Sequence, residues 1–253
     1  MCSKMRVLSF LIALTLCAAG PVSAQEENDT NLLNGVFLRG AYTSFSQAML
    51  LSWDEHDEIM LNQSKKVLTF GAGYAYVPED SWIGGSASVN FATTSLDPFA
   101  INKNFGGIDG ISPQTILQYS DISYSLLLFD FDAHILPIGK LPVALTLGFV
   151  LGGSFQSYEV KGDTEPILMN ANGSKSLNMF RYGYILGCKI VPFRFVSLDF
   201  EYRPMAGYTS TTHYTDYLYS KVIDGVKWNY FGSSSTTEGP SENMFLMGLS
   251  VHF

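Results

Sequence analysis

The sequence predicts an all-β protein, a transmembrane antiparallel up-and-down β-barrel, and three observations support this fold class. The C-terminal segment places Phe245, Met247, Leu249, Val251 and Phe253 at every second position, so one face of a strand carries the large apolar side chains. Similar alternating segments recur along the chain, with short and long connections in turn. After the N-terminal segment, no apolar run of about 18 residues could form a spanning helix. A closed barrel is then the structure that satisfies every backbone group in lipid.

Alternating segments predict eight transmembrane strands. They lie near residues 35–45, 66–77, 82–94, 120–135, 143–160, 179–191, 195–207 and 242–253. The seventh segment is the clearest, because Asp199, Glu201 and Arg203 lie on one face while Phe200 and Tyr202 lie on the other. Charges at a period of two, opposite an apolar row, require a polar interior and an apolar exterior. A soluble sandwich would instead enclose a dry core and turn its polar face outward.

The connections between these segments alternate in length. Short connections near 78–81, 137–142 and 192–194 contain proline or glycine, as tight turns require. The long connections run roughly over residues 46–65, 95–119, 161–178 and 208–241. Short periplasmic turns and long extracellular loops are typical of outer-membrane barrels, and eight strands would place both termini in the periplasm.

Two segments leave alternatives open. In the fourth strand, Tyr124 shares a face with Asp130. Either the alternation slips through a bulge at residues 126–128, or Tyr124 stands above the bilayer. In the last loop, Asp224-Gly225 indicates a tight hairpin, whose arms could be two further spanning strands and make ten. Neither face of residues 213–223 is cleanly apolar, so we expect a hairpin that extends the barrel wall.

The N-terminus predicts a secretory signal peptide over residues 1–24, followed by one barrel domain over residues 25–253. Basic Lys4 and Arg6 precede an apolar run, and small residues precede Gln25. A lipidated Cys17 is the weaker alternative, because Leu16 is not small. Cleavage would leave 13 basic and 23 acidic residues, a net charge of −10, which argues against nucleic acid as a partner. Cysteine would remain at a single position, so no internal disulfide, cysteine metal cluster or cofactor is expected.

Nine charged or titratable side chains are predicted to face the lumen, if the apolar rows face lipid. They are Arg39, Asp130, Asp132, His134, Arg181, Lys189, Asp199, Glu201 and Arg203. An eight-stranded barrel is just wide enough for side chains to fill it, so opposite charges confined there should pair. The favoured interpretation is a plug of salt bridges that rigidifies the barrel. The alternative is a narrow or gated ion path along the same residues.

In strand pattern, loop asymmetry and terminal Phe253, the chain resembles the small bacterial outer-membrane barrels typified by OmpA and OmpX, and more loosely the OmpW type. The resemblance implies a location in the cell outer membrane. It also implies either a structural or interaction role of surface loops, or passage of small hydrophobic molecules. The charged interior departs from the OmpW pattern. We therefore expect a monomeric surface protein that contacts outer-membrane lipid and, through its loops, host or environmental ligands. A narrow porin-like channel for small solutes is the alternative.

The predicted loops offer few candidates for chemistry. An acidic patch over residues 53–58 could bind a divalent cation, although a solvated loop is the simpler interpretation. His213, Asp216 and Ser210 are the only catalytic candidates, and their spacing is not diagnostic, so no enzyme is expected. Aromatic residues crowd the last loop, as in a recognition surface or a barrel extension: Tyr208, Tyr214, Tyr217, Tyr219, Trp228 and Tyr230.

Overall fold

The computed structural model describes residues 33–53, 57–78, 81–103, 114–136, 143–162, 167–168, 174–193, 195–209, 212–238 and 241–253. The predicted signal peptide, Ser210 and most of the acidic patch lie outside the described residues. Within the described part, no helix is long and apolar enough to cross a bilayer.

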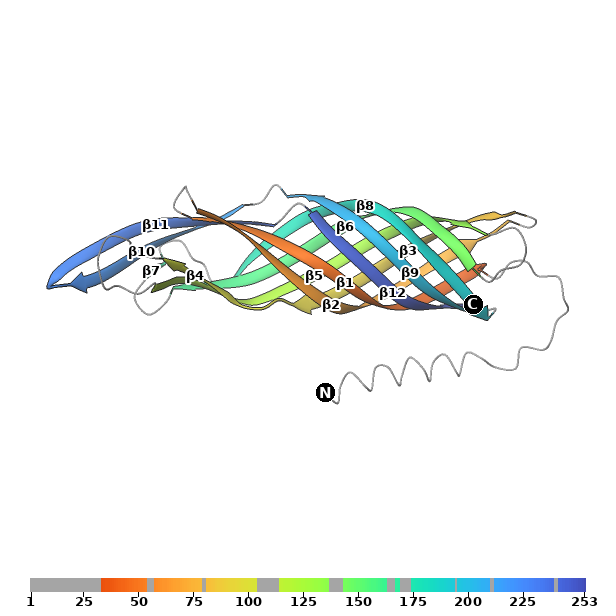
Figure 1. Ribbon diagram of the computed structural model, residues 1–253, viewed down its shortest axis with the longest axis horizontal. Coiled ribbons are helices and arrows are strands. Elements are labelled where there is room, and N and C mark those ends of the chain that lie inside the picture. The colour runs from red at the N-terminus through yellow and green to blue at the C-terminus, as the bar shows by residue number, and fades with distance from the viewer. Residues whose placement is uncertain are drawn as a thin grey trace, which may run out of the picture.

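The secondary structure of the described residues consists of antiparallel strands. They are β1 (Gly35–Trp53), β2 (Asp57–Tyr76), β3 (Ile83–Ser95), β4 (Phe99–Lys103), β5 (Gln114–Ile135), β6 (Val143–Gly162), β7 (Ile167–Leu168), β8 (Ser174–Phe193), β9 (Val196–Tyr208), β10 (His213–Ile223), β11 (Val226–Glu238) and β12 (Ser241–His252). Figure 1 shows them wound around one long axis.

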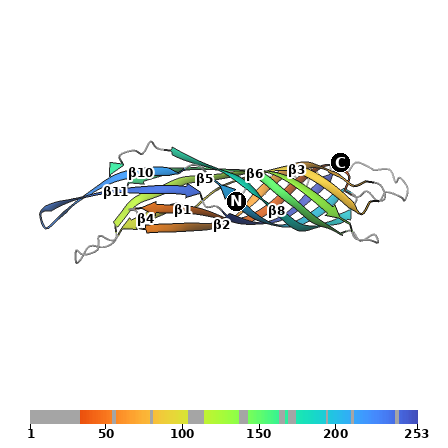
Figure 2. The same cartoon turned by 90° about the horizontal axis from the view of Figure 1, so that it is seen from above.

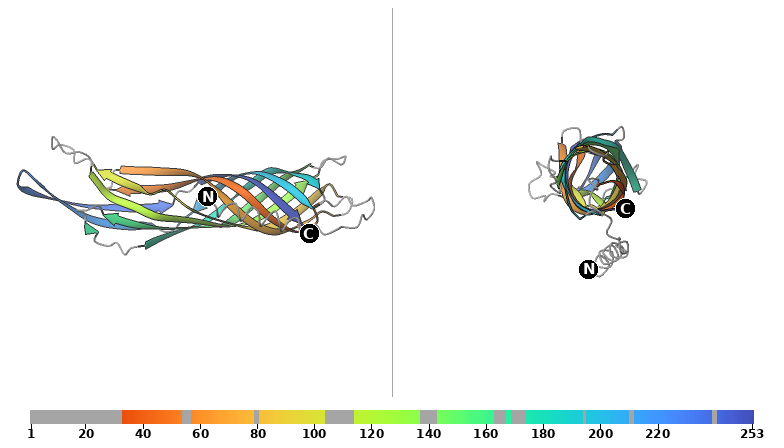
Figure 3. Two further views of the ribbon diagram at one scale, coloured as in Figure 1. Left: turned by 90° about the horizontal axis from the view of Figure 1, so that it is seen from below. Right: turned by 90° about the vertical axis from the view of Figure 1, so that its right-hand side faces the viewer.

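Eight of these strands form a closed barrel. Strands β1, β2, β3, β5, β6, β8, β9 and β12 pair in that order. The last strand closes the ring on the first, because β12 pairs with β1 from Phe37 opposite His252 to Phe45 opposite Met244. The view along the axis in Figure 3 shows the complete ring. The predicted all-β, eight-stranded barrel is confirmed.

The other strands extend the wall beyond one end of the ring, which we call the loop end. Strands β10 and β11 form a hairpin around Asp224 and Gly225, whose φ angles of 49° and 79° suit a tight turn. Strand β11 continues the wall by pairing with Met49–Trp53 of β1. In Figures 1 and 2 the hairpin projects past the other strands. It therefore lengthens the wall, as expected, and the ten-strand alternative is wrong.

The opposite end, which we call the turn end, carries Phe253 and the strand ends Tyr76, Ile83, Ile135 and Val143. An apolar belt surrounds the barrel, and at the turn end it finishes in exposed aromatic side chains, among them Trp82, Phe193 and Phe195. Exposed apolar side chains of the belt include Leu38, Tyr42, Phe70, Tyr74, Val89, Phe91, Phe129, Phe131, Leu147, Phe149, Tyr182, Leu186, Phe200, Phe245, Met247 and Leu249. An apolar outer band with aromatic girdles is the arrangement that lipid and its interface require.

The alternation of β5 settles the first ambiguity. Leu126 and Leu128 are buried on the same face as Asp130, Asp132 and His134, so the alternation does not slip at residues 126–128. The register shift lies nearer the loop end, between Ser120 and Ser123. Of the two alternatives, the bulge at residues 126–128 is therefore wrong, and the position of Tyr124 beyond the belt remains. Its outward neighbours Ser123 and Ser125 are polar, in keeping with that position.

Candidate functional site in the barrel interior

The structure places all nine predicted lumen residues inside the barrel. Arg39, Asp130, Asp132, His134, Arg181, Lys189, Asp199, Glu201 and Arg203 are each at most 6% exposed. Their backbones alternate with belt residues, so period-two geometry turns each of them inward. They do not form one cluster. Arg181 stands apart from the others, nearer the loop end.

Seven of them form what we call the charged tier: Arg39, Asp130, Asp132, Lys189, Asp199, Glu201 and Arg203. Arg203 is its centre. Its two terminal nitrogens bind both oxygens of Asp130, at 3.1 and 2.6 Å, and its Nε donates to Glu201 Oε2 at 2.9 Å. A bidentate guanidinium–carboxylate pair fixes both distance and orientation. Strands β5 and β9 are thereby joined across the lumen.

Arg39 of β1 and Lys189 of β8 complete the pairing from strands close to β9. The Arg39 guanidinium lies 3.2 Å from Asp199, 3.3 Å from Glu201 and 3.6 Å from Asp130. Lys189 Nζ lies 3.2 Å from Asp199 Oδ1. Three cations on three strands thus share three carboxylates, which offsets much of the cost of burying each charge.

Neutral polar side chains satisfy further hydrogen bonds of this tier. Asn90 donates to Asp130 at 2.6 Å, and Ser250 donates to Asp199. Ser197 is 3.0 Å from His252 Nε2. These residues were not among the predicted site residues, although each lies on the inward face of an alternating strand. The only sequence feature that marks them is their position on the inward face, because serine and asparagine are also common in loops.

Asp132 is the exception within the charged tier. It forms no ion pair with any residue that the structure describes, and its closest hydrogen-bond donor is Ser86 Oγ at 3.4 Å. Ser86 also bonds His134 Nε2 at 2.9 Å. The tier therefore holds four carboxylates against three cations. One buried carboxyl group therefore has no cation of its own among the described residues.

Arg181 forms a separate ion pair that sequence reasoning missed. Its Nη2 lies 2.7 Å from Glu238 Oε1, and Ser154 joins the pair by donating to Glu238 at 2.7 Å and accepting from Arg181 Nε at 3.1 Å. Both ionic side chains are fully buried. Glu238 ends β11, in a stretch predicted as loop. The pair therefore ties the extending hairpin to β6 and β8 of the barrel.

Apart from the Arg181–Glu238 pair and a few buried polar side chains such as Ser154, the loop-end half of the interior is mainly apolar. Leucine, valine, methionine and tyrosine side chains fill it, including Leu126, Leu128, Val150, Leu177, Ile185, Met205, Tyr119, Tyr158 and Tyr217. We call this set the apolar tier. The Tyr119 hydroxyl reaches Ser234 and Thr236 of β11 at 3.1 and 3.3 Å, and its ring stacks on Phe99 with centroids 4.5 Å apart. Tyrosine here combines apolar packing with one satisfied polar group.

A smaller apolar layer lies at the turn end. Leu33, Val77, Ala144 and Val191 pack together there with Leu136. Along β8, Val191 follows Lys189, which itself follows Ile185 of the apolar tier. Phe37 lies beside the charged tier, with Lys189 Nζ 5.3 Å from its ring centroid. The charged tier is thus held between two apolar layers.

The other candidates are not brought together. His213 and Asp216 occupy alternate faces of β10, and His213 Nε2 lies 2.5 Å from the Ser176 carbonyl instead. Tyr217 and Tyr219 are buried, whereas Tyr208, Tyr214 and Trp228 are exposed. Within the described ranges, no group of three acidic, histidine or cysteine side chains could hold a metal ion. Cys188 has a free thiol and lies half-buried on the outward face of β8.

A closed antiparallel barrel with an apolar outer belt and a charged interior is the fold of a transmembrane β-barrel, the class to which bacterial outer-membrane proteins belong, and this chain has that fold. No protein-family model matches the chain, and no curated protein matches it in sequence.

Solved barrels resemble it at low identity. Neisserial surface protein A is 12% identical, with 87% of this chain and 97% of that one covered and a TM-score of 0.44. A major outer-membrane protein from Thermus thermophilus is also 12% identical, with 85% and 99% covered and a TM-score of 0.43. OprG from Pseudomonas aeruginosa is 9% identical, with 87% and 97% covered and a TM-score of 0.38. At these values none of them indicates what this chain binds.

Proposed function

We propose that this chain is a monomeric surface protein whose barrel is a rigid, closed anchor in the outer membrane and whose loop-end strands contact host or environmental molecules. The observation that carries the proposal is the interior. Paired charges fill its middle, and apolar layers lie on both sides of them. A conducting path needs continuous polar or hydrated lining. Apolar side chains on both sides of the charged tier interrupt such a path, and the polar group nearer the loop end is itself closed by the Arg181–Glu238 pair, which supports a plug rather than a channel.

The loop end supports the interaction role. Tyr214, Trp228 and Phe231 expose 56 to 63% of their surface on the β10–β11 hairpin, beyond the lipid-facing belt. Aromatic side chains exposed to water are characteristic of recognition surfaces, where they supply contact area with few rotatable bonds. We propose neither a catalytic role nor nucleic acid as a partner.

Ion flux through the refolded protein in a planar bilayer tests the closed anchor. We expect no ion current through the wild type, and none through Arg203→Ala wherever that variant remains folded. Folding is checked by the heat-dependent mobility of the barrel on gels. Steady conductance of the wild type, altered in selectivity by Asp199→Asn, would support the narrow channel instead and contradict the plug.

Adhesion tests the surface role separately. Bacteria that display the protein should bind cultured epithelial cells more than bacteria without it. Trp228→Ser together with Phe231→Ser should lower that binding, because the exposed aromatic contacts are lost. The matched control is Phe129→Leu, a change within the lipid-facing belt. Equal binding by displaying and non-displaying bacteria would count against contact with such a host surface.

A further inference from the structure

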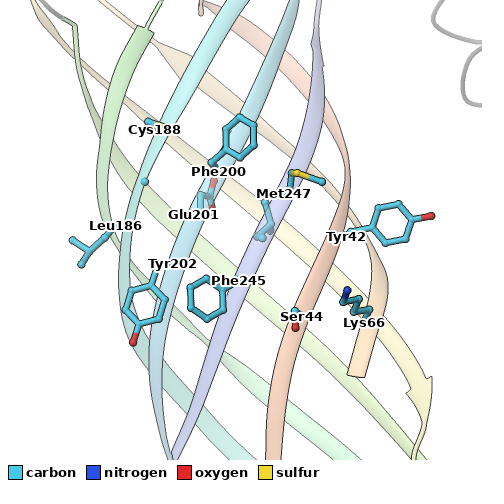
Figure 4. Close-up of a pocket in the computed structure, with 12 residues that line it drawn as sticks. Tyr42, Ser44, Lys66, Leu186, Cys188, Phe200, Glu201, Tyr202, Phe245 and Met247 are labelled. Atoms are coloured by element: carbon cyan, nitrogen blue, oxygen red, sulfur yellow. The ribbon is translucent and has the colours of Figure 1, made fainter. Parts of the chain in front are cut away.

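A groove of about 630 Å³ lies on the outer wall of the barrel, across β2, β1, β12, β9 and β8. Its volume falls within the range of about 300–1,000 Å³ that is usual for small-molecule sites. Figure 4 shows Tyr42 and Lys66 on one side, with Phe200, Tyr202 and Phe245 on the other. The groove opens outward toward lipid, so it is separate from the charged lumen.

Two adjacent rows of cross-strand partners explain the hollow. The row nearer the loop end contains Lys66, Ser44, Phe245, Tyr202 and Leu186 in order across the strands. The next row contains Tyr42, Met247, Phe200 and Cys188. Large and small side chains therefore stand side by side. Tyr42, Phe245 and Met247 each expose 58% of their surface and form the walls, whereas Ser44 and Cys188 leave space between them.

Lys66 gives the groove a positive charge at one corner. Its neighbour Lys65 lies on the other face of β2 and pairs with Asp97 at 2.6 Å. Lys66 is exposed on the outward face and forms no ion pair with the residues that the structure describes. The acidic residue among those lining the groove, Glu201, is buried and holds Arg39 and Arg203 inside the barrel. The ammonium of Lys66 is thus available to an anion from outside.

The polarity of the wall changes at this point. Toward the loop end, the outward side chains Ser64 and Asn243 are polar and exposed. Toward the turn end, Phe70 and Leu249 continue the apolar belt. Lys66 therefore marks the height at which headgroups would meet acyl chains. Lysine at a membrane interface places its charge among headgroups while its stem covers apolar surface.

We infer that this groove binds an anionic, phosphate-bearing membrane lipid. Lys66 pairs with the lipid phosphate, and an acyl chain lies between Tyr42 and Met247 on one side and Tyr202 and Phe245 on the other. Charge complementarity and the adjoining apolar walls together fit an amphiphile rather than free phosphate. The contact differs from general lipid solvation because it couples a headgroup charge to one preformed groove.

Native mass spectrometry of the refolded chain from nanodiscs tests the inference. The discs contain phosphatidylcholine with a minor fraction of phosphatidylglycerol. We expect wild type and Lys66→Arg to retain phosphatidylglycerol. Lys66→Ala should retain about fivefold less, equivalent to about 1 kcal/mol for one lysine near an anionic surface. Ser44→Trp should fill the groove and lower retention although Lys66 is intact. Heat-dependent gel mobility confirms that each variant is folded.

Lys227→Ala, at the distant hairpin turn, is the matched charge control and should retain phosphatidylglycerol like wild type. Excess inorganic phosphate should not displace the lipid, because phosphate alone gains nothing from the apolar walls. Equal retention by wild type and Lys66→Ala would overturn the headgroup assignment. A similar loss of phosphatidylglycerol in Lys227→Ala would indicate general electrostatic attraction to the protein instead of a site at Lys66. Full retention in Ser44→Trp would show that the acyl chain does not bind in the groove.

Discussion

The two halves of the barrel interior are both filled by side chains, but one is filled mainly by ion pairs and the other mainly by apolar groups. In the charged tier, Arg203 and Arg39 are held by carboxylates, and Arg39 also donates to the Ser250 hydroxyl at 3.4 Å. In the apolar tier, Leu177 and Met205 fill space without polar partners. The apolar tier is stabilised by the area it removes from water. The charged tier depends instead on the ion pairs of its three cations with Asp130, Asp199 and Glu201, so loss of one of these partners should be costly.

The largest expected effect is that of Arg203→Ala. Removal of the guanidinium leaves Asp130 and Glu201 buried beside each other, which should lower the free energy of unfolding by about 3–5 kcal/mol. Urea unfolding in lipid vesicles measures this. Met205→Ala, on the same face of β9, is the matched change in the apolar tier. The loss of unfolding free energy caused by Arg203→Ala should be smaller in acid, because the two carboxylates can then be protonated. The loss caused by Met205→Ala should be the same at both pH values. Equal acid responses would contradict the distinction between the tiers.

A second prediction compares two carboxylates on one face of β5. Asp130→Asn removes a partner of two arginines and should cost roughly 3–5 kcal/mol. Asp132→Asn removes a carboxylate that forms no ion pair with the described residues, and should cost at most about 1 kcal/mol or stabilise the barrel. Both are measured by urea unfolding at neutral pH. Similar losses would mean that Asp132 takes part in the pairing.

A third prediction concerns the link between hairpin and barrel. Glu238→Gln keeps the shape of the side chain but removes its charge opposite Arg181, so the local cost should be about 1–3 kcal/mol. Hydrogen exchange of β11 should accelerate, while exchange of β3, far from this pair, should not change. Ser233→Ala, an exposed change on β11, is the control. Uniform acceleration in all strands would show that the pair stabilises the whole barrel instead.

The smallest effect is expected for Tyr119. Burial raises its pKa above the ordinary value of 10.0, and the Ser234 and Thr236 hydroxyls offset this only in part. Because the folded barrel favours the neutral phenol, this contribution is complete below pH 10 and is lost as the pH rises through the higher folded value. Stability should therefore decline above about pH 10. Thermal unfolding of wild type and Tyr119→Phe should show a shallower decline in the variant.

The sequence predicted the barrel and its charged residues because lipid imposes a strict rule on the belt. Outward Phe200 and Tyr202 must be apolar, so the intervening Asp199, Glu201 and Arg203 can face only inward. Asp224-Gly225 was likewise sufficient to predict a hairpin, because few residues adopt positive φ readily.

The partners of the buried charges, and the buried residues of β11, could not be predicted because they depend on contacts between strands. Glu238, Ser234 and Thr236 face inward at alternate positions of β11, but that strand lies beyond the belt, where polar residues suit either face. The two faces of β11 therefore do not differ in polarity, so the sequence alone could not show which of its residues point inward. The choice of partners also depends on the arrangement of strands around the ring, since Arg203 binds Asp130 across the lumen rather than along the chain.

The pairing of β12 with β1 has a consequence for how the protein folds. The strands that complete the ring lie at opposite ends of the chain, so Phe37 meets His252 only after the whole barrel sequence has been made available. Contacts of such large sequence separation slow folding, because a long stretch of chain must be ordered before they form. Until that moment two strand edges stay open, and open edges invite pairing with other chains. Pairing of the last strand with the first therefore both closes the ring and removes the two edges at which another chain could pair.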